Sequence, residues 1–166
     1  MRQSKVLFIT QAALIAAIYT ALTYFISAFN LASGAIQVRI SEALTILPVF
    51  TPAAIPGLFL GCLISNSLTG CIPLDIVFGS LATLLGAIGT YALRKHHLYA
   101  CLPPIIANTL IVPLVLLYGY GIPGSLPFFI LTVGAGEVIS CGILGTALYT
   151  ALLPVKHFLA SAQTGQ

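Results

Sequence analysis

Residues 39–52 read Arg-Ile-Ser-Glu-Ala-Leu-Thr-Ile-Leu-Pro-Val-Phe-Thr-Pro, and the same apolar stretch continues through Ala-Ile-Pro-Gly to Leu60. It places a cation, Arg39, about one helical turn before an anion, Glu42. Only 5% of the chain is charged, whereas 59% is hydrophobic. Because burying an ionisable side chain costs about 3 kcal/mol unless it has a partner or a task, both residues are candidates for function.

The composition predicts the fold class. A chain of 166 residues that is this apolar indicates an all-α integral membrane protein, with a single domain over residues 1–166. The net charge of +3 does not indicate a nucleic-acid partner, because the basic residues lie in three separate places that flank apolar runs. The four cysteines lack the spacing of metal ligands. Neither a metal nor a cofactor is therefore expected.

The sequence lacks the motifs of the common enzyme classes. It has no Gly-rich phosphate loop with Lys-Ser/Thr, so the chain itself is not expected to hydrolyse ATP. It also has no His-Glu-x-x-His, no Gly-x-Ser-x-Gly and no Cys/His pair expected on one side of the membrane. The prediction is a small binding protein rather than an enzyme.

Six apolar segments are candidates for membrane spans. Two of them, on either side of Thr51-Pro52, are short. The first has about 13 residues, and a helix of that length, roughly 20 Å, cannot cross a core of about 30 Å without tilt or local thinning. Polar or Gly-Pro loops are predicted at 30–37, 65–73 and 119–125. The six segments are 6–28, 38–50, 53–68, 75–93, 98–118 and 127–153.

The basic residues predict the orientation. The positive-inside rule places these residues in the cytoplasm: Arg2, Lys5, Arg94, Lys95 and Lys156. The chain must then cross an even number of times between Lys5 and Arg94, so the two short segments contribute two crossings or none. Two crossings give six spans, which we prefer, and none gives four spans with a re-entrant hairpin. Either count places both termini in the cytoplasm and puts Arg39 and the 65–73 loop on the outer side.

All three acids are expected in the outer half or near the centre of the membrane. Glu42 and Asp75 lie toward the outside, and Glu137 lies about ten residues into the last helix, roughly 15 Å deep. With Arg39 as the one base among them, such a site suits a cationic solute or one rich in hydrogen-bond donors, and it disfavours phosphates. Glu137, which follows Gly134-Ala-Gly, is the strongest candidate for a ligand contact.

Each of the other candidates has a structural alternative. Arg39 and Glu42 either line the site or form an intrahelical pair that anchors a helix at the interface. Asp75 follows Pro73 at a helix start, which favours a capping role. Asn108 either binds a ligand or bridges two helices.

The first segment carries two overlapping Ala-x-x-x-Ala pairs, Ala12 with Ala16 and Ala13 with Ala17. Small residues at this spacing let another helix approach closely. On this basis alone, the alanines either pack within the chain or dock a separate subunit.

Aromatic residues gather at the expected outer ends of the helices. Most of them are expected to form an interfacial belt, and one or two turned inward would offer a face on which a flat ring can stack. They are Tyr24, Phe25, Phe29, Tyr118, Tyr120, Phe128 and Phe129.

Four parts of the chain carry a family resemblance: residues 38–57, Gly61-Cys62 with Asn66, residues 75–85, and Gly136-Glu137. In these parts the chain resembles the QueT family of queuosine-precursor transporters, the substrate-binding S-components of energy-coupling factor (ECF) importers. The likeness extends from the first helix to about Leu153.

The resemblance implies a six-helix, ECF S-component-like bundle in the bacterial cell membrane. Such a protein captures a 7-deazaguanine outside the cell, in the aminomethyl or cyano form or as queuine. Its partners would be a transmembrane coupling protein and two cytoplasmic ATPases. Related proteins dock through Ala-x-x-x-Ala on the first helix, so the resemblance favours a partner surface at Ala12 and Ala16 or at Ala13 and Ala17.

The chemistry of the ligand fits the acids. A guanine-like ring presents N–H and amino donors side by side, which one carboxylate accepts through two parallel bonds, and Glu137 or Glu42 is our candidate. An aminomethyl cation would pair with Asp75, while an aromatic side chain would stack on the base. Asn66 is a further candidate contact. The stretch from Arg39 to Leu60 is expected to shape and gate the entrance to the site.

Other functions stay open at this point. An S-component for another vitamin or nucleobase is the nearest alternative, because a fold does not determine its ligand. A stand-alone secondary carrier would require a site for a coupling ion. A membrane enzyme or an assembly scaffold has no support in the sequence.

Overall fold

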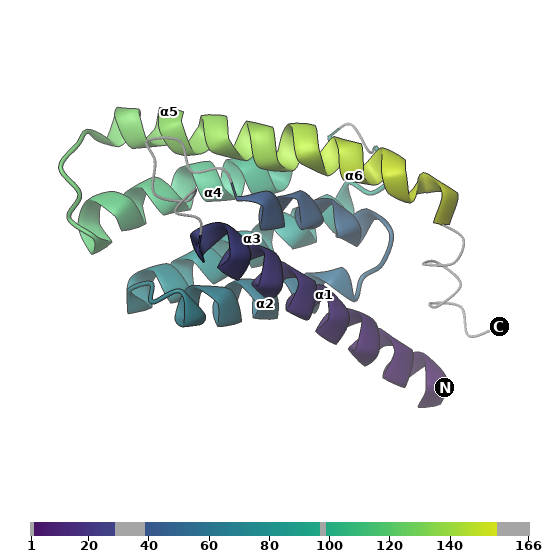
Figure 1. The fold of residues 1–166 in the computed structure, drawn as a ribbon. Helices are drawn as coiled ribbons and strands as arrows, with labels where there is room; N and C mark the ends of the chain where they lie inside the picture. Colours follow the sequence, from purple (N-terminus) through teal and green to yellow (C-terminus); the bar gives the residue numbers. More distant parts are fainter. Residues whose placement is uncertain (1, 29–38, 97–98, 156–166) are drawn as a thin grey trace.

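The computed structural model of the protein describes residues 2–28, 39–96 and 99–155, which form helices and connecting turns with no strand among them (Figure 1). This confirms the predicted all-α fold class. The predicted loop at 30–37 and Lys156 lie outside the described residues. The helices are α1 (Arg2–Ala28), η1 (Ile40–Val49), α2 (Ala54–Leu68), α3 (Pro73–Ala92), α4 (Leu102–Leu114), η2 (Val115–Gly119), α5 (Leu126–Glu137), η3 (Val138–Leu144), α6 (Gly145–Leu152) and η4 (Leu153–Val155).

Four of the described helices are long and apolar enough to cross a membrane, as a multi-pass membrane protein requires. Two others are shorter, η1 with 10 residues and α2 with 15. The preferred count of six spans is therefore not confirmed by helix length, and how η1 and α2 cross stays a prediction. The four long helices are Lys5–Ser27, Pro73–Ala92, Leu102–Gly119 and Leu126–Leu152.

The first short helix, η1, lies inside the bundle. It is a 3-10 helix, which rises about 2.0 Å per residue and so extends roughly 20 Å over its length. In Figure 1 it begins near the middle of the bundle and runs toward the end that carries the described termini. It packs against α1, α3, α6 and η3, and most of its residues are buried. The predicted break at Thr51-Pro52 is confirmed, since both residues lie between η1 and α2.

The second short helix, α2, ends at Leu68, which is the end predicted for the segment 53–68. The loop predicted at 65–73 overlapped this segment, and its first residues, 65–68, are helical. Polar residues remain in this last turn because they bond to the helix itself: the Ser65 hydroxyl donates to the carbonyl of Cys62 at 3.0 Å. The turn that follows contains Gly70 at a φ of 76°, a left-handed conformation that favours glycine.

The fifth segment begins later than predicted. The helix α4 starts at Leu102 rather than at 98, with Pro103 in its first turn. Proline is tolerated there because the first N–H groups of a helix have no partner within the helix. The sequence pattern placed the apolar boundary correctly, but the chain turns at residues 99–101 before the helix forms.

The connections divide between the two ends of the bundle (Figure 1). The N-terminal end of α1 and the C-terminal end of α6 lie together at one end, whereas the α2–α3 turn and the α4–α5 connection lie at the other. That the chain ends and the 65–73 region face opposite sides of a membrane stays a prediction. Which end faces the cytoplasm stays a prediction from the basic residues.

Glycines bring α2 close to α1. A Cβ at Gly57 would lie 2.8 Å from the carbonyl oxygen of Ala12, and one at Gly61 would lie 2.8 Å from the Cβ of Tyr19. Ala12 and Ala16 are buried on the same side of α1. Small residues on both helices therefore allow a contact that larger side chains would prevent.

Glycines of α3 likewise let this helix pack closely against α4. A Cβ at Gly86 would lie 2.7 Å from the Cα of Pro104, and one at Gly89 would lie 2.4 Å from the Cβ of Pro103. These glycines of α3 thus face a proline-containing helix. These tight contacts hold α3 and its first turn in a defined position next to the cavity described below.

Candidate functional site

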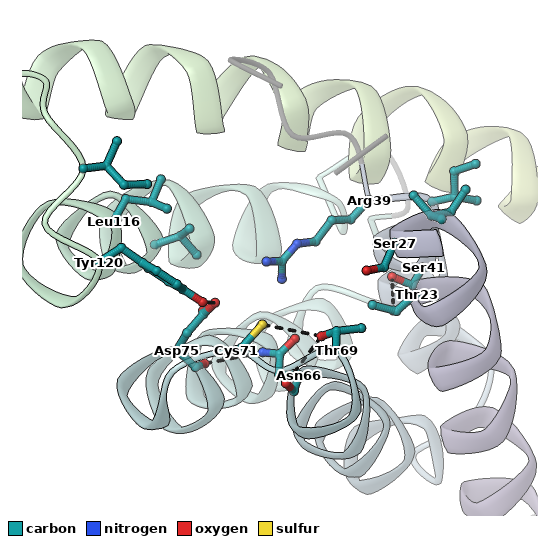
Figure 2. Close-up of a pocket in the computed structure, with 14 residues that line it drawn as sticks. Thr23, Ser27, Arg39, Ser41, Asn66, Thr69, Cys71, Asp75, Leu116 and Tyr120 are labelled. Carbon is teal, nitrogen blue, oxygen red and sulfur yellow. Dashed lines mark hydrogen bonds between the residues drawn. The ribbon is translucent and has the colours of Figure 1, made fainter. Parts of the chain in front are cut away.

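A cavity of about 250 Å³ lies where the end of α1, the start of η1, the end of α2 and the start of α3 meet the η2–α5 connection (Figure 2). Polar side chains line much of it, and apolar residues of α1, α4 and η2 complete the wall. The lining residues are Thr23, Ile26, Ser27, Arg39, Ile40, Ser41, Asn66, Thr69, Cys71, Asp75, Val112, Leu116, Tyr120 and Ile122.

Arg39 supplies the positive charge of the cavity. Its side chain extends into the space between the helices in Figure 2, while its backbone N–H donates to the hydroxyl of Ser140 at 3.2 Å. Among the described residues it forms no ion pair with an acid, although Glu42 and Asp75 both act on it through space. Because a guanidinium carries five N–H donors, Arg39 has donors left for a ligand.

Asp75 supplies the negative charge. It lies in the first turn of α3, as predicted, but no side chain caps this helix and the Asp75 carboxylate bonds elsewhere. Its Oδ2 accepts a hydrogen bond from the Tyr120 hydroxyl at 2.9 Å. Its Oδ1 is buried and has no hydrogen-bond partner. The side chain is therefore a wall of the cavity rather than a helix cap.

Tyr120 is the aromatic residue of the predicted set that lines the cavity, among the residues that the structure describes. Its hydroxyl donates to Asp75 and accepts a hydrogen bond from the Ile72 N–H at 3.4 Å. Partial burial raises the pKa of Tyr120 well above its usual value, and the negative charge of Asp75 is the second cause of this increase. The hydroxyl thus keeps its proton and remains a donor. Tyr120 is one of seven aromatic residues predicted at the outer helix ends, and no sequence pattern distinguishes it from the other six.

The end of α2 forms another wall. The Asn66 side-chain amide donates to the backbone carbonyl of Asp75 at 3.4 Å, and Thr69 lies beside Cys71 with 3.5 Å between oxygen and sulfur. A Cβ at Gly79 would lie 3.1 Å from both Asn66 Nδ2 and Asp75 Oδ1, so this glycine leaves room for the two side chains. Cys71 and Thr69 were not predicted, because a single Cys or Thr in a turn carries no distinctive pattern.

A second polar cluster lies among the helices away from the cavity wall. Glu42 is 1% exposed and Glu137 6% exposed, and neither they nor Asn108 lines the cavity. The Tyr19 hydroxyl donates to Glu42 Oε1 at 2.5 Å, and the Cys141 thiol donates to Glu137 Oε2 at 3.2 Å. Asn108 lies within hydrogen-bonding range of both carboxyl groups, while Glu42 Oε2 has no partner that meets hydrogen-bond geometry. We call these five residues the carboxyl cluster.

Three members of the carboxyl cluster have donor atoms close together. One oxygen of Glu42, one oxygen of Glu137 and the sulfur of Cys141 all lie within 4.8 Å of one another. Among the described side chains, this group most resembles the ligand arrangement of a metal site. However, the thiol already bonds to Glu137, and Thr45 donates to the Cys141 sulfur at 3.4 Å.

The predicted ligand contacts thus separate into two groups. Arg39, Asp75 and Asn66 meet in the cavity, whereas Glu137, Glu42 and Asn108 meet in the carboxyl cluster. The groups adjoin, because Arg39 acts electrostatically on Glu42 and Glu137 as well as on Asp75. The role of Glu137 as the main ligand contact stays a prediction.

The two alanine pairs of α1 have different environments. Ala12 and Ala16 are 8% and 7% exposed and face α2, whereas Ala13 and Ala17 are exposed. A shallow apolar groove runs along this exposed face between α1 and α2. It is lined by Ala13, Ala16, Ala17, Thr20, Ala21, Tyr24, Leu60, Ile64 and Leu68.

Comparisons with known proteins agree on a transporter family. The family described as QueT transporter matches residues 9–154. A curated relative, "Queuosine precursor transporter QueT" of Lactococcus lactis subsp. cremoris (strain MG1363), is 35% identical over 85 residues, which span 51% of this chain and 50% of the relative. No solved structure matches the chain significantly. Because the family match runs from α1 to the end of the last long helix, the chain belongs to the QueT transporter family.

Proposed function

We propose that this chain is the substrate-binding S-component of an ECF importer and that it captures a queuosine precursor, a 7-deazaguanine, outside the cell. Membership of the QueT transporter family supports transport, and the name of the Lactococcus relative suggests the substrate. The observation that carries the proposal is the cavity, which places Arg39 and Asp75 on different walls of one small space. Its volume of about 250 Å³ suits a single fused ring system rather than a nucleotide.

The cavity offers the groups that a 7-deazaguanine requires. The ring carries a carbonyl acceptor, which suits the N–H donors of Arg39, and it carries amide and amino donors, which suit a carboxylate. Tyr120 and the apolar side chains of Val112 and Leu116 provide surface for the flat faces of the ring. We propose Asn66 as a further polar contact.

Glu137 and Glu42 remain our proposed acceptors for the donor edge of the ring. Supporting this role, Glu42 Oε2 is buried without a partner, and Ser41, next to it in the chain, lines the cavity. The Thr23 hydroxyl donates to Ser41 at 2.8 Å and joins α1 to the start of η1 at the cavity wall. Because neither glutamate lines the cavity, contact with the ring requires the cavity wall to open toward the carboxyl cluster.

The chain has no ATP-binding motif, so the proposed function requires partners. We propose that a transmembrane coupling protein, driven by two cytoplasmic ATPases, docks on the groove between α1 and α2. Its floor carries Ala13 and Ala17, and small residues at this spacing permit close helix packing. Ala12 and Ala16 already pack against α2, so Ala13 and Ala17 are the pair that a partner helix can reach.

Binding by the purified protein tests the substrate. Isothermal titration calorimetry in detergent, with 7-deazaguanine and its 7-substituted forms, should show saturable binding. Competition by guanine and by unrelated vitamins defines the substrate class. If an unrelated vitamin binds tightly and no deazaguanine competes with it, the chain is an S-component for another ligand.

Tryptophan substitutions test the docking surface. Ala13→Trp and Ala17→Trp should leave ligand binding intact while abolishing uptake and co-purification with the coupling protein. Leu14→Trp is the matched control, because Leu14 is 60% exposed on α1 but does not line the groove. Normal uptake by both alanine variants would remove the groove from the docking site.

One observation favours a second function, a stand-alone secondary carrier. Such a carrier needs a buried site for a coupling ion, and the carboxyl cluster places two acids inside the bundle. Uptake by the purified chain alone in liposomes, driven by an ion gradient, would support this function. Uptake that requires the coupling protein and ATP would exclude it.

A further inference from the structure

The backbone N–H of Arg39 needs a hydrogen-bond acceptor from outside its own helix. Arg39 is the N-cap residue of η1, with a φ of −101° and a ψ of 103°. Its carbonyl accepts a hydrogen bond from the Glu42 N–H at 3.0 Å, but its own N–H precedes the helix and has no acceptor within it. Backbone N–H groups inside a fold are nearly always paired, so the partner comes from another element.

The last long helix supplies this acceptor. The Ser140 hydroxyl accepts a hydrogen bond from the Arg39 N–H at 3.2 Å, across 101 residues of the chain. Ser140 is 1% exposed and lies in η3, the π-helical part of the long helix, which packs against η1. Single π-helical turns are rare and often occur at functional sites. Ser140 itself does not line the cavity, so it can affect a ligand there only through another residue.

The residue after Ser140 contacts the same turn of η1. The Cys141 thiol lies 3.5 Å from the backbone carbonyl oxygen of Glu42, and the Thr45 hydroxyl donates to this carbonyl at 2.6 Å. Adjacent residues of η3 therefore hold both ends of the turn that begins at Arg39, its first N–H and its last carbonyl.

The helix α1 contacts this turn through different residues. The Thr23 hydroxyl donates to the Ser41 hydroxyl at 2.8 Å, and the Tyr19 hydroxyl donates to the Glu42 carboxyl group. Neither bond involves Arg39. Among the described residues, the bond to Ser140 is therefore the one that ties the Arg39 backbone to another helix.

The position of this backbone matters because the Arg39 side chain is long. The side chain extends from the start of η1 into the cavity, where its guanidinium lies between the walls (Figure 2). An arginine side chain loses rotational freedom when a ligand fixes it, and a fixed backbone reduces the disorder that binding has to remove. A backbone free to shift would instead let the guanidinium leave the place where it meets a ligand.

We infer that Ser140 is a positioning residue of the binding site. By holding the Arg39 backbone it fixes the point from which the guanidinium enters the cavity, although Ser140 does not itself touch the ligand. This inference rests on the proposed function and deepens it, because it adds a residue outside the cavity that controls affinity through the cation of the cavity.

A double-mutant cycle tests whether Ser140 acts through Arg39. Calorimetry on the purified full chain in detergent gives affinities for 7-deazaguanine of the wild type, Ser140→Ala, Arg39→Gln and the double variant. Ser140→Ala should weaken binding about tenfold in the wild type but less than about twofold in the Arg39→Gln background, where the positioned side chain is absent. Equal losses in the two backgrounds, or no loss in the wild type, would overturn the inference.

Ser80→Ala is the matched control. Ser80 is also a fully buried helical serine outside the cavity lining, but its hydroxyl bonds to the carbonyl of Ile76 in its own helix. This variant should keep the wild-type affinity within about twofold. A loss as large as that of Ser140→Ala would show a general effect of removing a buried hydroxyl, and it would overturn the inference.

Hydrogen exchange tests the anchor without any ligand. In Ser140→Ala, the peptide containing residues 39–45 should exchange its amide hydrogens at least about threefold faster, while peptides of α3 exchange as in the wild type. Unchanged exchange at 39–45 would overturn the inference. Should Ser140→Ala fail to fold, Ser140→Cys takes its place, because it keeps the size of the side chain and its sulfur is only a weak acceptor.

The two measurements separate this inference from the proposed function. If 7-deazaguanine does not bind to wild-type protein that elutes as a single folded species, the substrate class is wrong, and hydrogen exchange still decides whether Ser140 anchors Arg39. If 7-deazaguanine binds and Ser140→Ala changes neither affinity nor exchange, the binding site stands and the positioning role is wrong.

Discussion

The cavity and the carboxyl cluster place similar polar groups in different surroundings. In the cavity, Arg39 and Asp75 lie on different walls of a space that can hold a ligand. In the carboxyl cluster, Glu42 and Glu137 lie with Tyr19, Cys141 and Asn108 among packed helices, where most of their bonds go to one another. The difference shows that burial of an acid in this bundle does not by itself identify a ligand contact. What distinguishes Asp75 is that it is buried and also borders a space.

The largest effect is expected at Arg39. Arg39→Gln should weaken deazaguanine binding at least about 30-fold, because it removes the one cation of the cavity and its charged donors. Calorimetry measures the affinity, with Arg94→Gln as control, since Arg94 lies 4.1 Å from the centre of the Tyr91 ring outside the cavity. Unchanged affinity in Arg39→Gln would mean that the cavity is not the binding site.

Glu137→Gln tests whether the carboxyl cluster takes part in binding. If Glu137 accepts the donor edge of the ring, the substitution should lower affinity about tenfold, because an amide cannot accept both bonds. Cys141→Ala serves as control, since it removes the thiol bond to Glu137 and leaves the carboxyl group. Wild-type affinity in Glu137→Gln would make the cluster an internal scaffold and restrict binding to the cavity.

Gly79→Ala tests how closely the cavity wall is fitted. The added methyl would lie 3.1 Å from both Asn66 Nδ2 and Asp75 Oδ1, so it should displace one of them and weaken binding about three- to tenfold. Gly142→Ala is the matched control, because its nearest neighbours would be 3.8 and 3.9 Å away. Equal effects of the two substitutions would indicate a general loss of packing rather than a change in the site.

The smallest effect on binding is expected at Tyr19. Tyr19→Phe removes the hydrogen bond to Glu42 and should lower the melting temperature by a few degrees while changing affinity less than about threefold. Thermal unfolding in detergent and calorimetry measure the two quantities. The opposite result, weak binding with unchanged stability, would show that Glu42 needs this bond in order to reach the ligand.

Much of the architecture was predictable because a membrane restricts the choices. Apolar length identified the four long helices, and the break at Thr51-Pro52 was visible in the sequence. The errors fell at helix ends. Residues such as Ser65 appear as loop signals but remain helical, because their hydroxyl groups bond to helix carbonyls.

The site was predictable only in part. Charge in an apolar chain identified Arg39, Asp75, Glu42 and Glu137, because few ionisable residues survive in such a solvent. Their division between the cavity and the carboxyl cluster was not predictable, since it depends on how the ends of α1, α2 and α3 meet. Tyr120 lies 45 residues from Asp75 in the chain, and the two form a hydrogen bond because the tertiary fold brings them together.

The sequence by itself determined that this chain is a helical membrane protein with few charges, no ATP-binding motif and two alanine pairs on its first helix. These properties follow from composition and local spacing, which need no knowledge of contacts between distant residues. The tertiary structure alone decided that Ala12 and Ala16 face α2 while Ala13 and Ala17 remain exposed, and that Asp75 borders a cavity. Which side of a helix is covered, and which buried acid borders a cavity, depends on neighbours that packing brings together from remote parts of the chain.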